Sequence, residues 1–98
     1  MINRINKSIS HTISKNEVAL ASFLTVGYPS INLFSDILDA VIEGGSDIIE
    51  LGVPFSDPLA EGPTIQKTSN QALVNGINLE KVLTVAEQTR KSYPNIIW

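Results

Sequence analysis

The sequence predicts an α/β protein in which parallel strands alternate with helices. Two short apolar runs, residues 18–26 and 47–52, are typical of buried strands, and helical apolar spacing occurs before, between and after them. Successive strands joined by helices pair in parallel through right-handed crossovers. The doubly wound sheet and the (β/α)8 barrel share this pattern, and the pattern alone does not separate them. Length suggests that residues 1–98 form a single domain.

The first helix and the first strand are predicted within the first 26 residues. An amphipathic helix is expected over about residues 2–14, because isoleucines recur there at three- and four-residue steps: Ile2, Ile5, Ile9 and Ile13. The run Val18–Val26 has no polar alternation, which is typical of a strand buried on both faces. The turn formers of residues 27–29 end it.

A second helix and a second strand follow. Ser30 is a favourable N-cap, an apolar stripe runs through residues 33–42, and Gly44-Gly45 predicts the end of the helix. The run from Asp47 to Gly52 predicts a strand that is interrupted only by Glu50. Turn-forming residues then predict a loop over residues 53–62.

Two further helices and the start of a third strand complete the pattern. Pro63 suits the first position of a helix that ends near Gly76, and Asn78 is the expected N-cap of a helix that ends at Tyr93-Pro94. Residues 96–98 are apolar and predict a strand that begins there. Two complete βα units cannot close a barrel, so we expect a fragment of a longer protein.

Composition narrows the class of function. The net charge is -3 and Lys and Arg are scattered, which argues against nucleic acid or an anionic membrane as partner. There is no cysteine, and the single histidine, His11, is expected to be a solvated helix residue, so neither a metal site nor a Ser/His/Asp triad is predicted. No apolar run or signal peptide indicates a membrane. A cytoplasmic enzyme fits these features.

Glu50 is the most informative residue for chemistry. It lies near the carboxyl end of a predicted strand, where active sites of α/β proteins form. A carboxyl group at this position is suited to proton transfer. The alternative is a structural carboxylate held by backbone N–H groups of the following loop, and position alone does not decide between the two.

The loop after this strand holds two more acids, Asp57 and Glu61. An acid eleven positions after Glu50 could complete an acid/base pair over the same strand end, although loop acids are more often solvated turn residues. The loop is no P-loop, because no Gly-Lys-Ser/Thr follows it. Phe23 lies inside the first strand, where an aromatic side chain is normally part of the core.

The string IELGVPFSDPLAEGPTIQ, residues 49–66, closely resembles the signature of tryptophan synthase alpha chains. The segment FLTVGYP, residues 23–29, is similar to that family's first barrel strand and the loop after it. The resemblance implies a (β/α)8 TIM barrel with an extra N-terminal helix. Because this fold typically takes about 250 residues, the chain would be the opening portion of the barrel and incomplete.

The resemblance also implies an activity and a partner. The expected reaction is the aldol-type cleavage of indole-3-glycerol phosphate to indole and glyceraldehyde 3-phosphate in L-tryptophan biosynthesis. It needs neither a metal nor an organic cofactor in this chain. The family works with a tryptophan synthase beta chain in an alpha2-beta2 tetramer, and pyridoxal phosphate belongs to that partner. Since the family builds its phosphate site late in the barrel, this chain alone is expected to be inactive.

Site residues follow by resemblance. Glu50 matches the glutamate assigned to proton transfer, Glu61 matches the second acid, which faces the indole nitrogen, and Phe23 matches a residue that lines the indole pocket. The family most often has Asp at position 61. A loop that contacts the beta chain is matched by Pro54, Phe55, Ser56, Asp57 and Pro58.

Two other functions remain open at the level of sequence. One is another phosphate-handling (β/α)8 enzyme, against which the block of residues 51–66 argues, because general barrel physics does not require that string. The other is a non-catalytic partner-binding module. The presence of Glu50 favours an enzyme over such a module.

Overall fold

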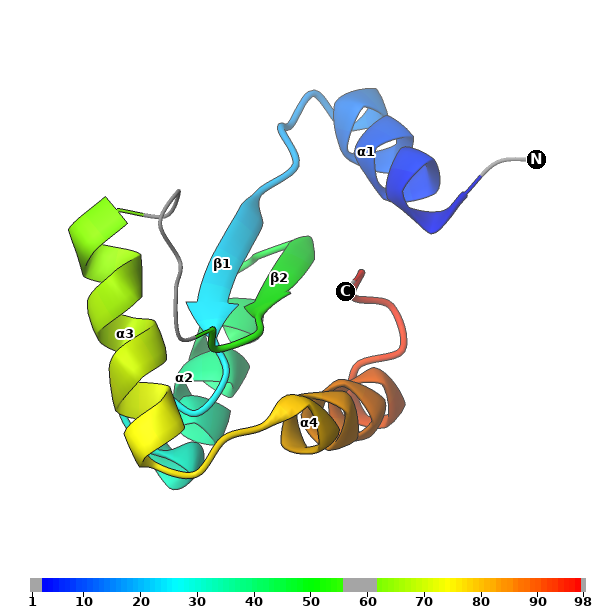
Figure 1. Ribbon diagram of the computed structural model, residues 1–98. Helices are drawn as coiled ribbons and strands as arrows, with labels where there is room; N and C mark the ends of the chain where they lie inside the picture. The colour runs from blue at the N-terminus through cyan, green and yellow to red at the C-terminus, as the bar shows by residue number, and fades with distance from the viewer. Residues whose placement is uncertain (1–2, 56–61, 98) are drawn as a thin grey trace.

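The structure is a computed structural model that describes residues 3–55 and 62–97 (Figure 1). Its helices and strands follow one another in the predicted alternation. In chain order they are α1 (Arg4–Ser14), β1 (Ala21–Thr25), α2 (Ile31–Glu43), β2 (Ile48–Gly52), α3 (Gly62–Val74) and α4 (Leu79–Ser92). Each of the predicted helices is present, and the predicted α/β class is confirmed.

The two strands form a parallel pair, in register from Ala21 beside Ile48 to Thr25 beside Gly52. Ile97 adds an isolated parallel bridge to Ile48, and the Ile49 N–H donates to the Ile97 carbonyl at 2.8 Å. The third strand predicted at residues 96–98 therefore begins beside β2, although Trp98 lies outside the described residues. Each strand thus lies next to its predecessor in the chain, which is the order that a (β/α)8 barrel follows.

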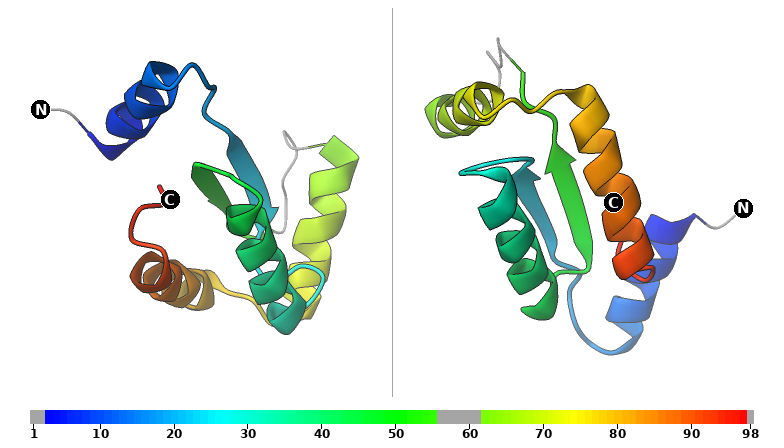
Figure 2. Two further views of the ribbon diagram at one scale, coloured as in Figure 1. Left: turned by 180° about the vertical axis from the view of Figure 1, so that it is seen from behind. Right: turned by 90° about the horizontal axis from the view of Figure 1, so that it is seen from below.

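The core lies between one face of the sheet and the helices. The side chains of Leu24 and Leu51 lie on this face of the sheet and pack against the buried cluster. Figure 2 shows α2 lying against the sheet on this side. The buried cluster consists of Val26, Phe34, Leu38, Ile49, Ala72, Ile77 and Val82.

The ends of the helices follow from capping residues in the sequence. Ser30 Oγ accepts a hydrogen bond from the Leu33 N–H at 3.2 Å, and Asn78 Oδ1 accepts one from the Lys81 N–H at 2.9 Å. These bonds satisfy backbone donors that a first helical turn leaves unpaired. Helix α2 ends before Gly45, whose φ of 112° a residue with a Cβ rarely adopts. Both predicted N-caps are confirmed.

The first strand differs from its prediction. It is shorter than the apolar run of residues 18–26, and Val18 is 87% exposed. Its burial alternates from Ala21 to Leu24, with Ala21 and Phe23 exposed while Ser22 and Leu24 are half-buried. The prediction of a strand buried on both faces is therefore wrong for the described chain. The reason is that α2 and α4, which supply residues of the buried cluster, cover the face of Leu24. Within residues 3–55 and 62–97 the face of Phe23 is covered only near its end, by α3.

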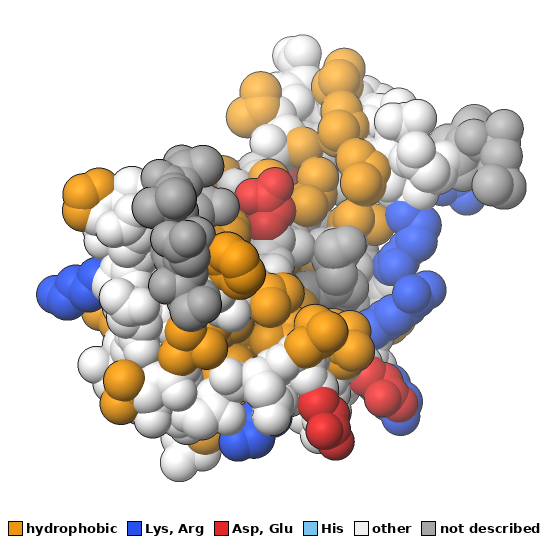
Figure 3. Space-filling model, in the orientation of Figure 1, with side chains coloured by type: hydrophobic (Ala, Val, Ile, Leu, Met, Phe, Trp, Pro, Cys, Tyr) orange, Lys and Arg blue, Asp and Glu red, His pale blue; other side chains and the backbone are white. Residues whose placement is uncertain are grey.

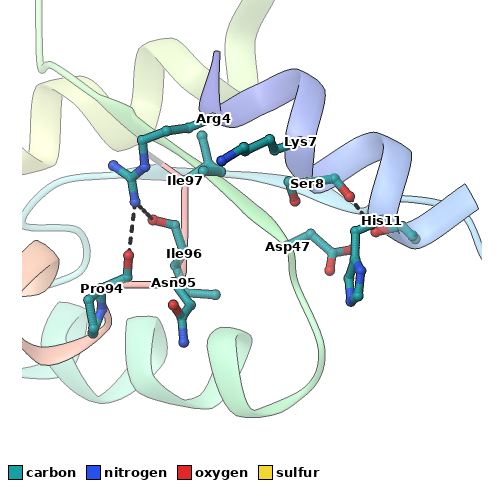
Figure 4. Close-up of a pocket in the computed structure, with 10 residues that line it drawn as sticks. Arg4, Lys7, Ser8, His11, Asp47, Pro94, Asn95, Ile96 and Ile97 are labelled. Carbon is teal, nitrogen blue, oxygen red and sulfur yellow. Dashed lines mark hydrogen bonds between the residues drawn. The ribbon is translucent and has the colours of Figure 1, made fainter. Parts of the chain in front are cut away.

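Helix α1 lies at the end of the sheet where the strands start (Figure 1). Arg4 Nη2 donates to the carbonyls of Pro94 at 2.9 Å and of Ile96 at 3.2 Å, which joins α1 to the segment that leads into the third strand (Figure 4). A cavity of about 480 Å³ lies between them. His11 lines it and is exposed, as predicted for a solvated helix residue.

A candidate active site at the carboxyl ends of the strands

Strand pairing brings the predicted acid and the predicted aromatic residue together. Phe23 on β1 and Glu50 on β2 are partners in the parallel register. Since side chains alternate along a strand, both lie on the face opposite Leu24 and Ile49, which belong to the helix-covered side. Two residues that are 27 positions apart in the sequence therefore stand side by side, near the carboxyl ends of their strands.

The Glu50 side chain is exposed. Within residues 3–55 and 62–97 it takes part in no hydrogen bond and no ion pair. The alternative prediction, a structural carboxylate held by backbone N–H groups, therefore has no support in the described part of the chain. A carboxylate without such partners is available to exchange a proton with a bound molecule.

The Phe23 ring stands over the backbone of Gly52. A Cβ added to Gly52 would lie 2.4 Å from Phe23 Cζ, which is far inside van der Waals contact. Gly52 is buried, so its missing side chain is what leaves room for the ring. The sequence prediction used Gly52 only as the end of a strand. No local signal distinguishes a glycine that accommodates a distant ring from one that makes a turn.

A cavity of about 440 Å³ adjoins this contact. Its size and largely apolar lining suit a small aromatic molecule. Figure 3 shows hydrophobic side chains gathered on this side of the molecule. The lining residues come from both strands, the segment after β2 and α3: Phe23, Leu51, Gly52, Val53, Phe55, Ile65 and Ser69.

Polar contacts hold α3 against the end of β1. Thr25 Oγ1 and Thr68 Oγ1 lie 2.8 Å apart, and Asn75 Nδ2 donates to the carbonyls of Gly27 at 3.2 Å and of Pro29 at 2.7 Å. Neither Thr68 nor Asn75 was among the site residues predicted from the sequence. The spacing of Thr68 within the face of α3 that holds Ser69 and Ala72 was a usable signal, but its partner on β1 was visible only in three dimensions.

The remaining predicted residues divide into two groups. Pro54 is buried and Phe55 is exposed and lines the cavity. The other members of the predicted loop and the second acid lie outside the described residues: Ser56, Asp57, Pro58 and Glu61. The structure thus brings together Phe23, Glu50 and Phe55 at one end of the sheet.

Two further features of residues 3–55 and 62–97 concern metal binding and membrane spanning. No group of three or more His, Cys, Asp or Glu side chains is arranged to hold a metal ion there. No helix in the same ranges has the length and apolar character needed to cross a membrane.

These features define the opening part of an α/β barrel with an acid and an aromatic side chain at its strand ends. A sequence profile of the tryptophan synthase alpha chain family matches residues 9–97. The chain belongs to this family. Membership confirms the resemblance of residues 23–29 and 49–66, and with it the opening portion of a (β/α)8 barrel that carries an extra N-terminal helix, α1.

Individual members of the family are similar to this chain over most of its length. The tryptophan synthase alpha chain of Desulfosudis oleivorans is 46% identical over 92 residues, which are 94% of this chain and 35% of the relative. That of Aquifex aeolicus is 44% identical over 95 residues, 97% of this chain and 36% of the relative. The crystal structure of the tryptophan synthase alpha chain from Legionella pneumophila superposes with a TM-score of 0.88 at 32% identity, covering 98% of this chain and 36% of that one. The chain spans about a third of the length of these relatives.

Proposed function

We propose that this chain provides the first part of the active site of a tryptophan synthase alpha subunit. The proposed activity is that of a carbon–carbon lyase that cleaves indole-3-glycerol phosphate to indole and glyceraldehyde 3-phosphate. The observation that carries the proposal is the pairing of Glu50 with Phe23 beside an apolar cavity, in a chain of this family. An acid next to an aromatic surface is what cleavage of an indole side chain requires.

The chemistry divides between two carboxyl groups. Protonation of the indole C3 carbon gives an indolenine, and removal of a proton from the glycerol hydroxyl lets that oxygen form the aldehyde. The carbon–carbon bond then breaks, and its electron pair returns to the indolenine ring. Glu50 is the proposed group for these proton transfers, because its exposed carboxylate has no partner among the described residues.

The other predicted residues have supporting roles in this proposal. Phe23, whose ring tip lies against Gly52, would contact the indole ring. The carboxylate of Glu61 would accept a hydrogen bond from the indole N–H. The segment of residues 54–58 would contact a beta chain in an alpha2-beta2 tetramer, and the exposed Phe55 is the described side chain best suited to such a contact. Pyridoxal phosphate would belong to the beta chain, no organic cofactor or metal would be needed in this chain, and the assembly would be cytoplasmic.

The test uses a full-length protein that begins with these 98 residues, either from the complete gene or as a chimera with the remaining two-thirds of the Aquifex aeolicus relative. Purified protein should release indole from indole-3-glycerol phosphate, and an added beta chain should raise the rate. A folded full-length protein that releases no indole, yet binds a beta chain, would instead support a non-catalytic partner-binding module. Family membership already argues against a different phosphate-handling barrel enzyme.

A further inference from the structure

We propose that Thr68 is a positioning residue, which sets the affinity of the site for the aromatic part of the substrate through its hydrogen bond to Thr25. The inference rests on the function proposed above and adds a residue to it. Thr68 does not line the 440 Å³ cavity beside Gly52. It acts by holding in place Ile65 and Ser69, two residues of α3 that line this cavity.

The direction of the hydrogen bonds can be worked out from the hydroxyl groups. Thr68 Oγ1 donates to the Ile65 carbonyl at 3.0 Å. A hydroxyl has a single hydrogen, so in the 2.8 Å contact between the two threonines Thr25 is the donor and Thr68 the acceptor. A continuous chain of hydrogen bonds therefore runs from the end of β1 through Thr68 to the backbone of Ile65.

This chain of bonds ends at the wall of the cavity. Ile65, Thr68 and Ser69 are spaced by three and four residues, so they share the face of α3 that is turned toward the strand ends. Ile65 and Ser69 line the cavity with Phe23, and Ser69 is buried. The position of Thr68 thus fixes the distance between this wall and the Phe23 ring opposite.

Thr25 also depends on this hydrogen bond, because it is only 8% exposed and its hydroxyl is shielded from water. Without the Thr68 oxygen, its buried hydroxyl would lose its acceptor, which is unfavourable and is relieved by a shift of α3. Glu50 is on β2 and is not joined to α3 by any hydrogen bond among the described residues. Loss of the threonine pair should therefore disturb binding of the ring far more than the proton transfers.

The test compares variants of the full-length protein defined above. Thr68→Val keeps the side-chain shape and removes the hydroxyl. It should raise KM for indole-3-glycerol phosphate by about fivefold, the effect of one neutral hydrogen bond, with kcat within about twofold. The inhibition constant of indole as a product should rise by the same factor, while that of glyceraldehyde 3-phosphate stays unchanged. Thr68→Ser, which keeps the hydroxyl, should restore both values.

A matched control comes from α4. Thr84 also donates its hydroxyl to a carbonyl in its own helix, that of Glu80 at 3.0 Å, but it is exposed. Thr84→Val should leave all these constants unchanged. In a double-mutant cycle, Thr25→Val should add little to Thr68→Val, because either change removes the same bond.

The outcomes separate the inference from the function on which it rests. If the unmodified full-length protein releases no indole, the proposed function fails. The positioning role is then decided by the dissociation constant for indole, which Thr68→Val should still raise about fivefold and which stays unchanged if that role is wrong. If it is active and Thr68→Val keeps the KM and the indole inhibition constant of the unmodified protein, the positioning role is wrong. Equal weakening of indole and glyceraldehyde 3-phosphate would also overturn it, since a merely structural defect would act on both.

Discussion

Glu50 stands on the open face of a parallel sheet, next to an aromatic ring and without a partner among the described residues. A side chain in this position adds little to folding, so its replacement isolates its chemical role. Glu50→Gln keeps the shape and cannot exchange the proton. In the full-length protein we expect indole release to fall by at least about 100-fold, with an unchanged melting temperature.

Glu43→Gln is the control for this prediction, because Glu43 is an exposed acid in the last turn of α2, remote from the strand ends. That variant should keep full activity. A Glu50→Gln enzyme within about tenfold of the unmodified rate would exclude proton transfer by Glu50, since general acid–base catalysis contributes more than that.

The second carboxyl group is that of Glu61, which lies outside the described residues. Its replacement tests its role. If its carboxylate stabilises charge at the indole nitrogen, Glu61→Ala should lower turnover by about 100-fold with little change in melting temperature. Glu61→Asp should retain substantial activity, because the family commonly has the shorter acid there. A solvated turn residue would give nearly unchanged rates for both variants, and steady-state rates distinguish the two cases.

Gly52 gives a prediction about packing. A methyl group at this position would overlap the Phe23 ring, so Gly52→Ala should destabilise the full-length protein by about 1–3 kcal/mol. Urea denaturation measures the change. Combining it with Phe23→Leu should recover part of the loss, because the shorter side chain makes room for the methyl group. A double variant that shows only the sum of the two single effects would show that the two positions do not touch.

At the scale of helices and strands, the features predicted correctly from the sequence are those that depend on neighbouring residues. The caps at Ser30 and Asn78 and the end of α2 at Gly44-Gly45 depend on nearest neighbours, and the structure has all of them. The exposed face of β1 was predicted wrongly, because an apolar run does not show which elements will cover it. The pair Thr25–Thr68 spans 43 positions, and no local pattern contains such a contact.

One contact between helices has a dependence on pH. The Tyr93 hydroxyl, at the end of α4, donates to Asp39 Oδ1 of α2 at 2.8 Å. This hydrogen bond, then desolvation and the charges of Asp39 and Glu43, raise the pKa of Tyr93 above its ordinary value of 10.0. Because the folded pKa lies above the unfolded one, the contribution to stability is fully present below pH 10 and is lost as the pH rises through the folded pKa.

Two variants test this link. Tyr93→Phe should be slightly less stable than the unmodified protein at neutral pH, and the difference should shrink above pH 10. Asp39→Asn removes the charge of the acceptor and should bring the pKa of Tyr93 back toward its ordinary value, as measured by ultraviolet absorbance during an alkaline titration. A Tyr93 pKa that does not respond to Asp39→Asn would assign the shift to another cause.

At the scale of the whole molecule, the described chain is one sector of a barrel. Each of its strands lies beside the preceding one, α2 covers the outside, and α3 lies at the end where the candidate site forms. The face that carries Phe23 and Glu50 is the one that a closed barrel turns inward. Its side chains form an apolar, half-open cavity here, and the same side chains would form one wall of an enclosed site.

This arrangement predicts how the two strands respond to the rest of a barrel. Parallel sheets are normally covered on both faces, yet Phe23 is 43% exposed in the described chain. Complete burial of such a side chain contributes about 1.5–3 kcal/mol. Joining the 98 residues to the remaining two-thirds of the Aquifex aeolicus relative should therefore slow amide hydrogen exchange at Leu24 and Ile49 by at least about tenfold. Val18, which is 87% exposed, should exchange quickly in both proteins. Equal protection of the strand amides in the two proteins would mean that the inward face gains nothing from closure of the barrel.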